Sequence, residues 1–145
     1  MINYSKIKEE KDLSCNRYKN ALDGFNYANS DENICKTALT VWDITENAVQ
    51  TLTGLYIEKD DPEMNLDQQI LYLNEDKNVI PSGITGDYLT LKKVLYGSCQ
   101  YPSMSGNYNN LNRNEIIEEI KYTEKFLENV WGAIEKRFPE KESIL

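Results

Sequence analysis

Two long segments carry apolar residues at helical spacing, and this feature constrains the fold more than any other. In the segment 31–58 the stripe consists of Ile34, Ala38, Val41, Trp42, Thr45, Ala48, Val49, Leu52 and Leu55. In the segment 113–137 it consists of Ile116, Ile117, Ile120, Phe126, Leu127, Val130, Trp131 and Ile134. Each stripe needs a second apolar surface to pack against, so the two segments predict the long core helices of an all-α bundle, with Trp42 as a core anchor.

Three shorter helices are expected around this pair. Their apolar residues recur at helical spacing over 5–28, 65–75 and 87–97. The segment 74–86 contains Pro81, Gly83 and Gly86 and is expected to be a loop. No segment alternates between apolar and polar residues with the period of a strand. The sequence therefore predicts a single domain over residues 1–145, an all-α bundle of about five helices.

Polar residues that accept hydrogen bonds from unpaired backbone N–H groups mark where three helices begin. The candidates are Ser30 or Asp31 for the second helix, Asn65 or Asp67 for the third, and Asn112 with Glu115 for the last.

The chain of 145 residues contains no histidine. Histidine is the usual general base near neutral pH and the commonest metal ligand, so its absence excludes Ser-His and Cys-His nucleophile pairs and ExxH di-iron sites. The carboxylates of Asp60, Asp61 and Glu63 lack the spacing and the glycine of an EF-hand, and a solvated surface is their expected role. We therefore expect no metal and no cofactor.

Three cysteines, Cys15, Cys35 and Cys99, lie far apart in the sequence. Their spacing does not fit a CxxC zinc site, and an odd number does not form a closed set of disulfides. We expect all three to be buried, reduced thiols, as is typical of a cytoplasmic protein. The N-terminal segment lacks the apolar core of a signal peptide, and no segment approaches the length of a membrane span.

Charge is distributed unevenly around a formal net charge of −8. The segment 23–76 has twelve acids and two bases, whereas the segment 77–113 has four bases and one acid. An acidic surface can cover a basic active site and steer association with a basic partner. The candidate partner-binding residues of the acidic segment are Glu58, Asp60, Asp61 and Glu63.

Aromatic residues alternate with bases in the positive segment. Single-stranded nucleic acids are bound by this combination, through stacking on aromatic rings and phosphate contacts with bases. The candidate RNA-facing or partner-facing residues are Lys92, Lys93, Tyr96, Tyr108, Arg113 and Asn114. The alternative, which we favour, is that the tyrosines are simply abundant and close one end of the bundle with hydrogen bonds. Because the helix dipole disfavours an arginine at a helix start, we expect Arg113 to make a specific contact.

The order of these features resembles the HEPN superfamily, in particular the C-terminal domains of abortive-infection-type proteins. The resemblance covers about residues 20–137 and lies in the order of NSDENICKTALTVWDITENAVQTLTG, LDQQILYL, VIPSGI, TLKKVLYGSCQY and NEIIEEIKYTEKFLENVWGAIEKR. It implies a five-helix bundle, a homodimer and a role in bacterial or phage defence or in mobile-element biology.

Active HEPN proteins are metal-independent ribonucleases or act on nucleotides. Their motif is an arginine that steadies the phosphate, a polar residue and, a few residues on, a histidine that moves the proton. Alignment on Arg113 and Asn114 matches the first two positions and puts Glu118, Glu119 or Ile120 at the histidine position. Alignment through the preceding polar loop puts the motif on Ser105–Asn110, where both residues are missing. An exposed carboxylate is a poor general acid near pH 7, so the resemblance does not transfer the nuclease activity.

Three functions remain open on these grounds: a non-catalytic HEPN-like bundle that binds a protein partner or a second copy of itself, an acidic inhibitor or immunity-type protein that binds a basic partner, and a weak RNA or nucleotide binder. A homodimer is expected because the two apolar stripes are broader than a small bundle easily buries.

Overall fold

The computed structural model describes residues 4–26, 30–57, 63–81, 83–99 and 111–137. Within these ranges the chain forms five α-helices and no strand, which confirms the predicted all-α bundle. The helices are α1 (Tyr4–Asn26), α2 (Asp31–Ile57), α3 (Leu66–Leu71), α4 (Gly83–Leu91) and α5 (Arg113–Arg137). Two π-helical segments, η1 (Tyr72–Asp76) and η2 (Lys92–Gly97), continue α3 and α4.

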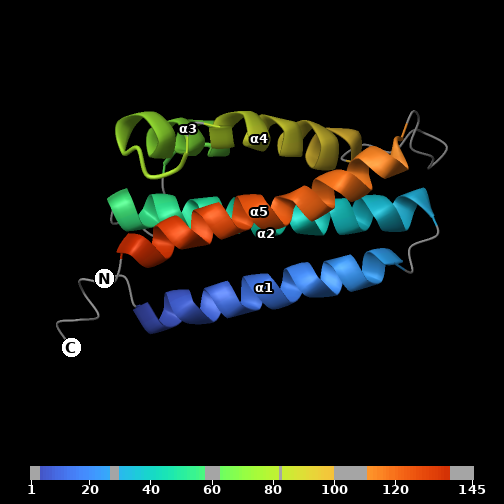
Figure 1. The fold of residues 1–145 in the computed structure, drawn as a ribbon, viewed down its shortest axis with the longest axis horizontal. Coiled ribbons are helices and arrows are strands. Elements are labelled where there is room, and N and C mark those ends of the chain that lie inside the picture. Colours follow the sequence, from blue (N-terminus) through green and yellow to red (C-terminus); the bar gives the residue numbers. More distant parts are fainter. Residues whose placement is uncertain (1–3, 27–29, 58–62, 82, 100–110, 138–145) are drawn as a thin grey trace.

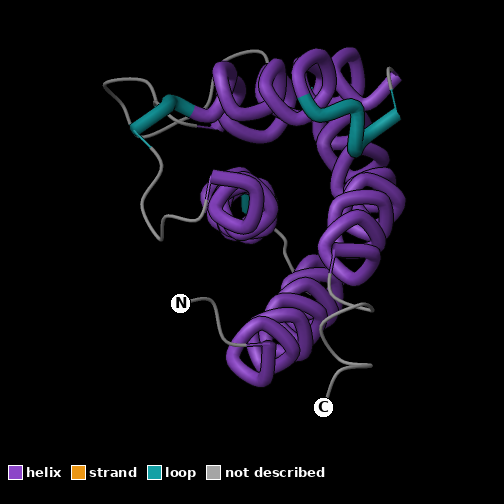
Figure 2. The backbone as a smooth tube through the Cα atoms, turned by 90° about the vertical axis from the view of Figure 1, so that its left-hand side faces the viewer, coloured by secondary structure: helices purple, strands orange, loops and turns teal. Residues whose placement is uncertain are grey.

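The helices lie in three layers (Figures 1 and 2). The helices α2 and α5 pack against each other and form the middle layer. On one side of them lies α1, and on the other side lie α3 and α4 with their π-helical continuations. Because α2 contacts α1, α3, α5 and η2, it is the central element of the bundle.

The two apolar stripes face the inside of this single chain. Trp42 is 5% exposed and Leu52 is fully buried in α2, while Phe126 and Ile134 in α5 are each 1% exposed. Since α1 and the α3–α4 layer cover both sides of the α2–α5 pair, the stripes are no broader than one chain buries. The breadth of the two stripes is therefore no reason to expect a homodimer.

Three leucines in the shorter predicted helices are exposed: Leu13, Leu71 and Leu89. In α1 the buried side chains are Ile7 and Tyr18, and Leu13 lies off the helix face that joins them. In α4 the residues Tyr88 and Leu91 enter the core, so Leu89 between them points outward.

The helix α4 begins at Gly83 rather than at the predicted Asp87. The backbone N–H of Ile84 donates a 3.0 Å hydrogen bond to the Pro81 carbonyl, and Ile84 is 2% exposed. Glycine disfavours a helix interior by about 1 kcal/mol, and the burial of one isoleucine outweighs that cost. The predicted loop 74–86 is thus partly helical, and its sharp turn falls at Asn78, with a φ of 51°.

The helix starts follow the predicted caps. The Ser30 hydroxyl accepts a 3.2 Å hydrogen bond from the Asn33 N–H at the start of α2, which identifies Ser30 rather than Asp31 as the cap. The Asn112 carboxamide oxygen accepts a 3.0 Å bond from the Glu115 N–H at the start of α5. The other predicted ends are confirmed within one or two residues, except that residues 27–28 and Glu58 lie outside the described ranges.

A buried tyrosine joins the first layer to the middle one. The Tyr18 hydroxyl of α1 donates a 2.7 Å hydrogen bond to the Ile120 carbonyl of α5. Burial raises the pKa of Tyr18 to about 12, so this hydroxyl keeps its proton near neutral pH. An ion pair between Arg17 and Asp43, at 3.0 Å, adds a contact from α1 to α2.

The cysteine prediction is correct for two residues and wrong for the third. Cys35 and Cys99 are buried and free, whereas Cys15 is exposed and free on the outer side of α1. Only one side of α1 is covered by the bundle, so its other side faces solvent.

No described helix has both the length and the apolar character needed to cross a bilayer.

Candidate functional site

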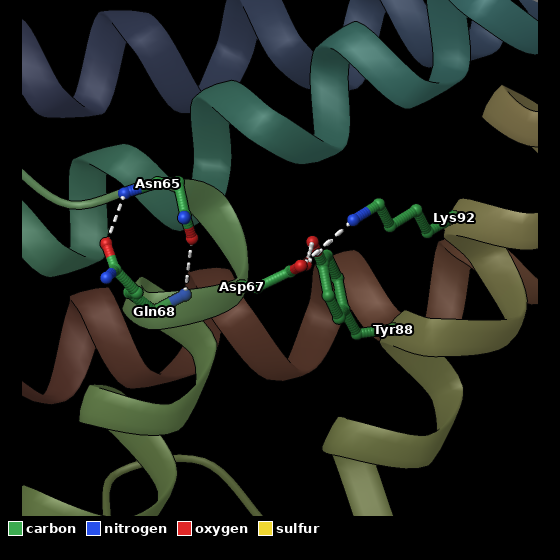
Figure 3. A network of polar contacts seen from close by, with 5 residues as sticks. All are labelled: Asn65, Asp67, Gln68, Tyr88 and Lys92. Atoms are coloured by element: carbon green, nitrogen blue, oxygen red, sulfur yellow. Dashed lines mark hydrogen bonds and ion pairs between the residues drawn. The ribbon is translucent and has the colours of Figure 1, made fainter.

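A polar and aromatic cluster lies where α3 meets α4 and η2 (Figure 3). It is built on the start of α3. The Asn65 carboxamide oxygen accepts a 2.9 Å hydrogen bond from the Gln68 N–H, and the Gln68 side-chain oxygen accepts a 2.9 Å bond from the Asn65 N–H. This capping box satisfies two unpaired backbone donors and fixes the first turn of α3, which carries Asp67.

Asp67 is the centre of the cluster. The Tyr88 hydroxyl donates a hydrogen bond to its carboxylate, and the Lys92 ammonium lies 3.0 and 3.1 Å from the two carboxylate oxygens. The Tyr88 hydrogen bond, followed by the Lys92 contact, holds the pKa of Asp67 below its usual value. Burial, together with the Asp67 contact, raises the pKa of Tyr88 well above that of a free phenol. The Asp67 carboxylate therefore stays charged and the Tyr88 hydroxyl keeps its proton near neutral pH.

Three aromatic rings line the inner side of this cluster. The Trp42 ring lies between those of Tyr88 and Tyr96, with centroid distances of 5.9 and 5.7 Å. Burial raises the pKa of the nearby Glu46 carboxyl, and a hydrogen bond from the Trp42 indole lowers it in part. The rings and the Asp67 contacts together join α2, α3, α4 and η2, so the cluster ties the middle layer to the third layer.

The predicted RNA-facing bases do not form one free positive surface. Lys92 is bound by Asp67 of α3, and Arg113 is bound by Asp31 of α2, with its Nε and Nη2 each 2.7 Å from the Asp31 Oδ1. The specific contact expected for Arg113 is thus present. Lys93 is exposed.

The remaining predicted site residues are placed as follows. Tyr96 is half-buried and stacked on Trp42, while Asn114 and Glu63 are exposed. Tyr108, Glu58, Asp60 and Asp61 lie outside the described residues.

An acidic surface that the sequence did not reveal lies across α4 and α5. Burial raises the pKa of Glu119, and the charges of Asp87 and Glu115 raise it further. Asp87 also raises the pKa of the exposed Tyr122, and its negative charge is the largest cause of that shift. Within the described ranges none of these acids forms an ion pair with a base. The four-residue spacing of Glu115 and Glu119 was visible in the sequence, but the approach of Asp87 requires the packing of α4 on α5.

The described part of the chain brings together no group of three or more residues suited to hold a metal ion. Comparison of the chain with family models, with curated proteins and with solved structures finds no match.

Proposed function

We propose that the chain is a non-catalytic, HEPN-like helical bundle that acts by binding a protein rather than by cleaving RNA. The observation that carries the proposal is the contact of Arg113 with Asp31. Arg113 matches the arginine that steadies the phosphate in the HEPN motif, and here its guanidinium joins the starts of α5 and α2. An arginine that is paired with a carboxylate must first leave this partner before it can bind a phosphate.

The proton-transfer position supports the same conclusion. The whole chain lacks histidine, and Glu118, Glu119 or Ile120 occupies the aligned position. The raised pKa of Glu119 brings it closer to a general acid, but its charged neighbours are Asp87 and Glu115 rather than Arg113. Arg113 thus interacts with Asp31 of α2, whereas the charge of Asp87 of α4 acts on Glu119.

A ribonuclease assay tests this proposal. Purified protein is incubated with labelled single-stranded RNA, in parallel with Arg113→Ala and Glu119→Gln variants prepared in the same way. We expect no cleavage above that of a mock preparation from cells without the gene, and no difference between the three proteins. Cleavage by the unaltered chain that either substitution removes would overturn the proposal.

A basic protein surface is the partner that a second observation favours. Burial raises the pKa of Glu119, and the negative charges of Asp87 and Glu115 beside it raise that pKa further by repulsion. Cationic side chains of a partner would relieve it, as in an inhibitor or immunity-type protein that covers a basic site. The acids at 58–63 were predicted for this role, and the α4–α5 surface is a better-defined candidate.

Binding of an oligolysine peptide is the probe for this surface. An Asp87→Asn/Glu119→Gln double variant should bind it several-fold more weakly at low salt than the unaltered chain. The matched control is Glu75→Gln/Asp76→Asn, which removes the same charge from the exposed end of η1. Equal weakening by both double variants would show that only net charge matters and would contradict this location.

The ion pairs of Lys92 and Arg113 make weak RNA binding the less favoured function, because both bases would have to leave their carboxylate partners. A homodimer and a role in defence or mobile-element biology follow from the HEPN resemblance alone.

A cytoplasmic location is proposed because the three cysteines are free thiols, which persist in reducing compartments.

A further inference from the structure

The face by which α1 packs on the bundle is interrupted by polar residues near its middle. The residues of this face alternate in spacing between four and three positions, and they are Ile7, Lys11, Ser14, Tyr18, Ala21 and Phe25. Ile7 and Tyr18 are buried, and the last two pack against the core. Lys11 and Ser14 are half-buried polar residues between them. The apolar stripe of α1 is therefore broken at two successive positions.

Two contacts set the register of α1 on α5. The Lys11 ammonium forms an ion pair with the Glu135 carboxylate, and two turns later the Tyr18 hydroxyl donates its hydrogen bond to the Ile120 carbonyl. Residue numbers rise along α1 as they fall along α5, so the two helices are antiparallel (Figure 1). The middle of the α1 face is therefore level with residues 127–131 of α5.

A buried tryptophan with an unpaired donor lies at this level. Trp131 comes one turn before Glu135 on the same face of α5 and is 5% exposed. Its indole N–H finds no hydrogen-bond partner among the described residues. A buried donor without a partner costs free energy, and the Ser14 side chain of α1 adds little apolar surface at this level. The chain's own α1 thus leaves both packing and a hydrogen bond unused.

We propose that the surface beneath α1 is a docking site for an amphipathic helix of a partner protein, which takes the place of α1. This α1 site consists of Asp43 of α2 and of Ile120, Trp131 and Glu135 of α5. It is separate from the acidic surface across α4 and α5, so either proposal can fail while the other stands.

Charge complementarity identifies the partner helix as a basic one. The two acids of the α1 site are paired with bases of α1, Glu135 with Lys11 and Asp43 with Arg17, the latter pair at 3.0 Å. A helix without bases would leave both carboxylates without these contacts. The expected partner helix therefore carries a base at each of the two positions and an apolar residue at the level of Ser14.

The chain's own α1 competes with such a helix because it is attached. Attachment gives α1 an effective concentration of about a millimolar, so a free helix replaces it only by binding the α1 site more tightly. Burial of one leucine side chain at the level of Ser14 supplies about a tenfold gain in affinity.

The test uses the full chain and two fluorescein-labelled peptides. Both peptides span residues 4–26 with Cys15→Ser, and one also carries Ser14→Leu. By fluorescence anisotropy we expect the Ser14→Leu peptide to bind about tenfold more tightly than the other. Hydrogen exchange on its complex should show that α1 of the chain loses protection, while α2 and α5 keep theirs.

Two outcomes of this experiment contradict the proposal. If the peptide binds while α1 of the chain stays protected, the peptide lies elsewhere on the molecule. If the Ser14→Leu peptide does not bind at about 1 mM, it does not compete with the attached helix, and the α1 site is closed to a partner.

Variants in α1 of the chain leave the α1 site itself intact. Ser14→Leu in the chain should raise the Tm and weaken peptide binding about tenfold, because the chain's own helix then fills the same level. A fall in the Tm would show that no space exists beside Ser14 and would overturn the proposal. Far-UV circular dichroism confirms that each variant is folded.

A second variant releases one acid of the α1 site. Arg17→Ala frees Asp43 for the peptide and should strengthen peptide binding several-fold. The matched control is Lys19→Ala, which removes the same charge from an exposed position of α1 and should leave binding unchanged. Equal effects of the two variants would show that only net charge matters and would overturn the proposal.

Discussion

At the scale of single residues, one carboxylate connects two helices and a π-helical segment. Asp67 accepts the Tyr88 hydroxyl and the Lys92 ammonium, although Asp67 itself is half exposed. Tyr88 is 1% exposed, so its ring is held by the core and its hydroxyl reaches the edge of the cluster. The sequence predicted neither contact, because Asp67 was considered only as a helix cap and Tyr88 was assigned no role.

Removal of the Tyr88 hydroxyl measures this contact. We expect Tyr88→Phe to lower the free energy of unfolding by about 1 kcal/mol, since the ring stays buried and water replaces the lost donor at the half-exposed carboxylate. Urea denaturation of both proteins gives the difference. Tyr56→Phe, at a half-buried tyrosine of α2, is the control and should change stability by less than half as much.

The lowered pKa of Asp67 predicts a pH dependence of stability. Because the folded-state pKa lies below the unfolded value of about 3.9, the carboxylate stabilises the fold above about pH 4, and that contribution is lost as the pH falls through the folded-state pKa. In thermal denaturation from pH 7 to pH 2.5, the Tm of the unaltered chain should therefore fall more steeply below pH 4 than that of Asp67→Asn. Parallel curves would contradict this role of Asp67.

At the scale of the elements, helix periodicity and capping residues predicted the long helices well. The helix α5 has the predicted ends, and Ser30, Asn65 and Asn112 are the caps. The segment around Gly83 was predicted less well, because the glycines indicate a loop locally while burial of Ile84 and Tyr88 favours a helix. The π-helical segments also escaped prediction, since their extra residue per turn depends on packing.

Loss of the Asn65 cap should destabilise the chain mainly around α3, because this helix is only six residues long. We expect Asn65→Ala to lower the free energy of unfolding by about 1 kcal/mol. Hydrogen exchange should show the loss mainly in α3 and η1, with α5 unaffected. Asn114→Ala, at an exposed residue in the first turn of α5, is the control, and an equal loss there would show that the effect is not specific to the cap.

At the scale of the whole molecule, the burial of both apolar stripes bears on association. The exposed large apolar residues of the described ranges are Leu13, Leu71, Leu89 and Tyr122. They are distributed over α1, α3, α4 and α5, with no more than one on each helix. We therefore expect any self-association to depend on charged surfaces rather than on an apolar interface.

Sedimentation equilibrium at low and high salt checks this expectation. A dimer held by charges should dissociate as salt screens them, so the chain should be monomeric at about 0.5 M salt. A dimer that persists there would establish an apolar interface and contradict the expectation. The acidic surface across α4 and α5 could not be located from the sequence, because Asp87 is far from Glu115 and Glu119 in it.

The three-layer arrangement also has a dynamic consequence. The buried apolar side chains of α1 are Ile7 and Tyr18, whereas α2 buries many more, so α1 is held by the least buried surface of the three layers. Local opening begins where least surface is buried, which makes separation of α1 the first opening step of the native molecule. That step exposes the apolar side of the α2–α5 pair, so the rate at which α1 returns sets how long the chain is open to misassembly.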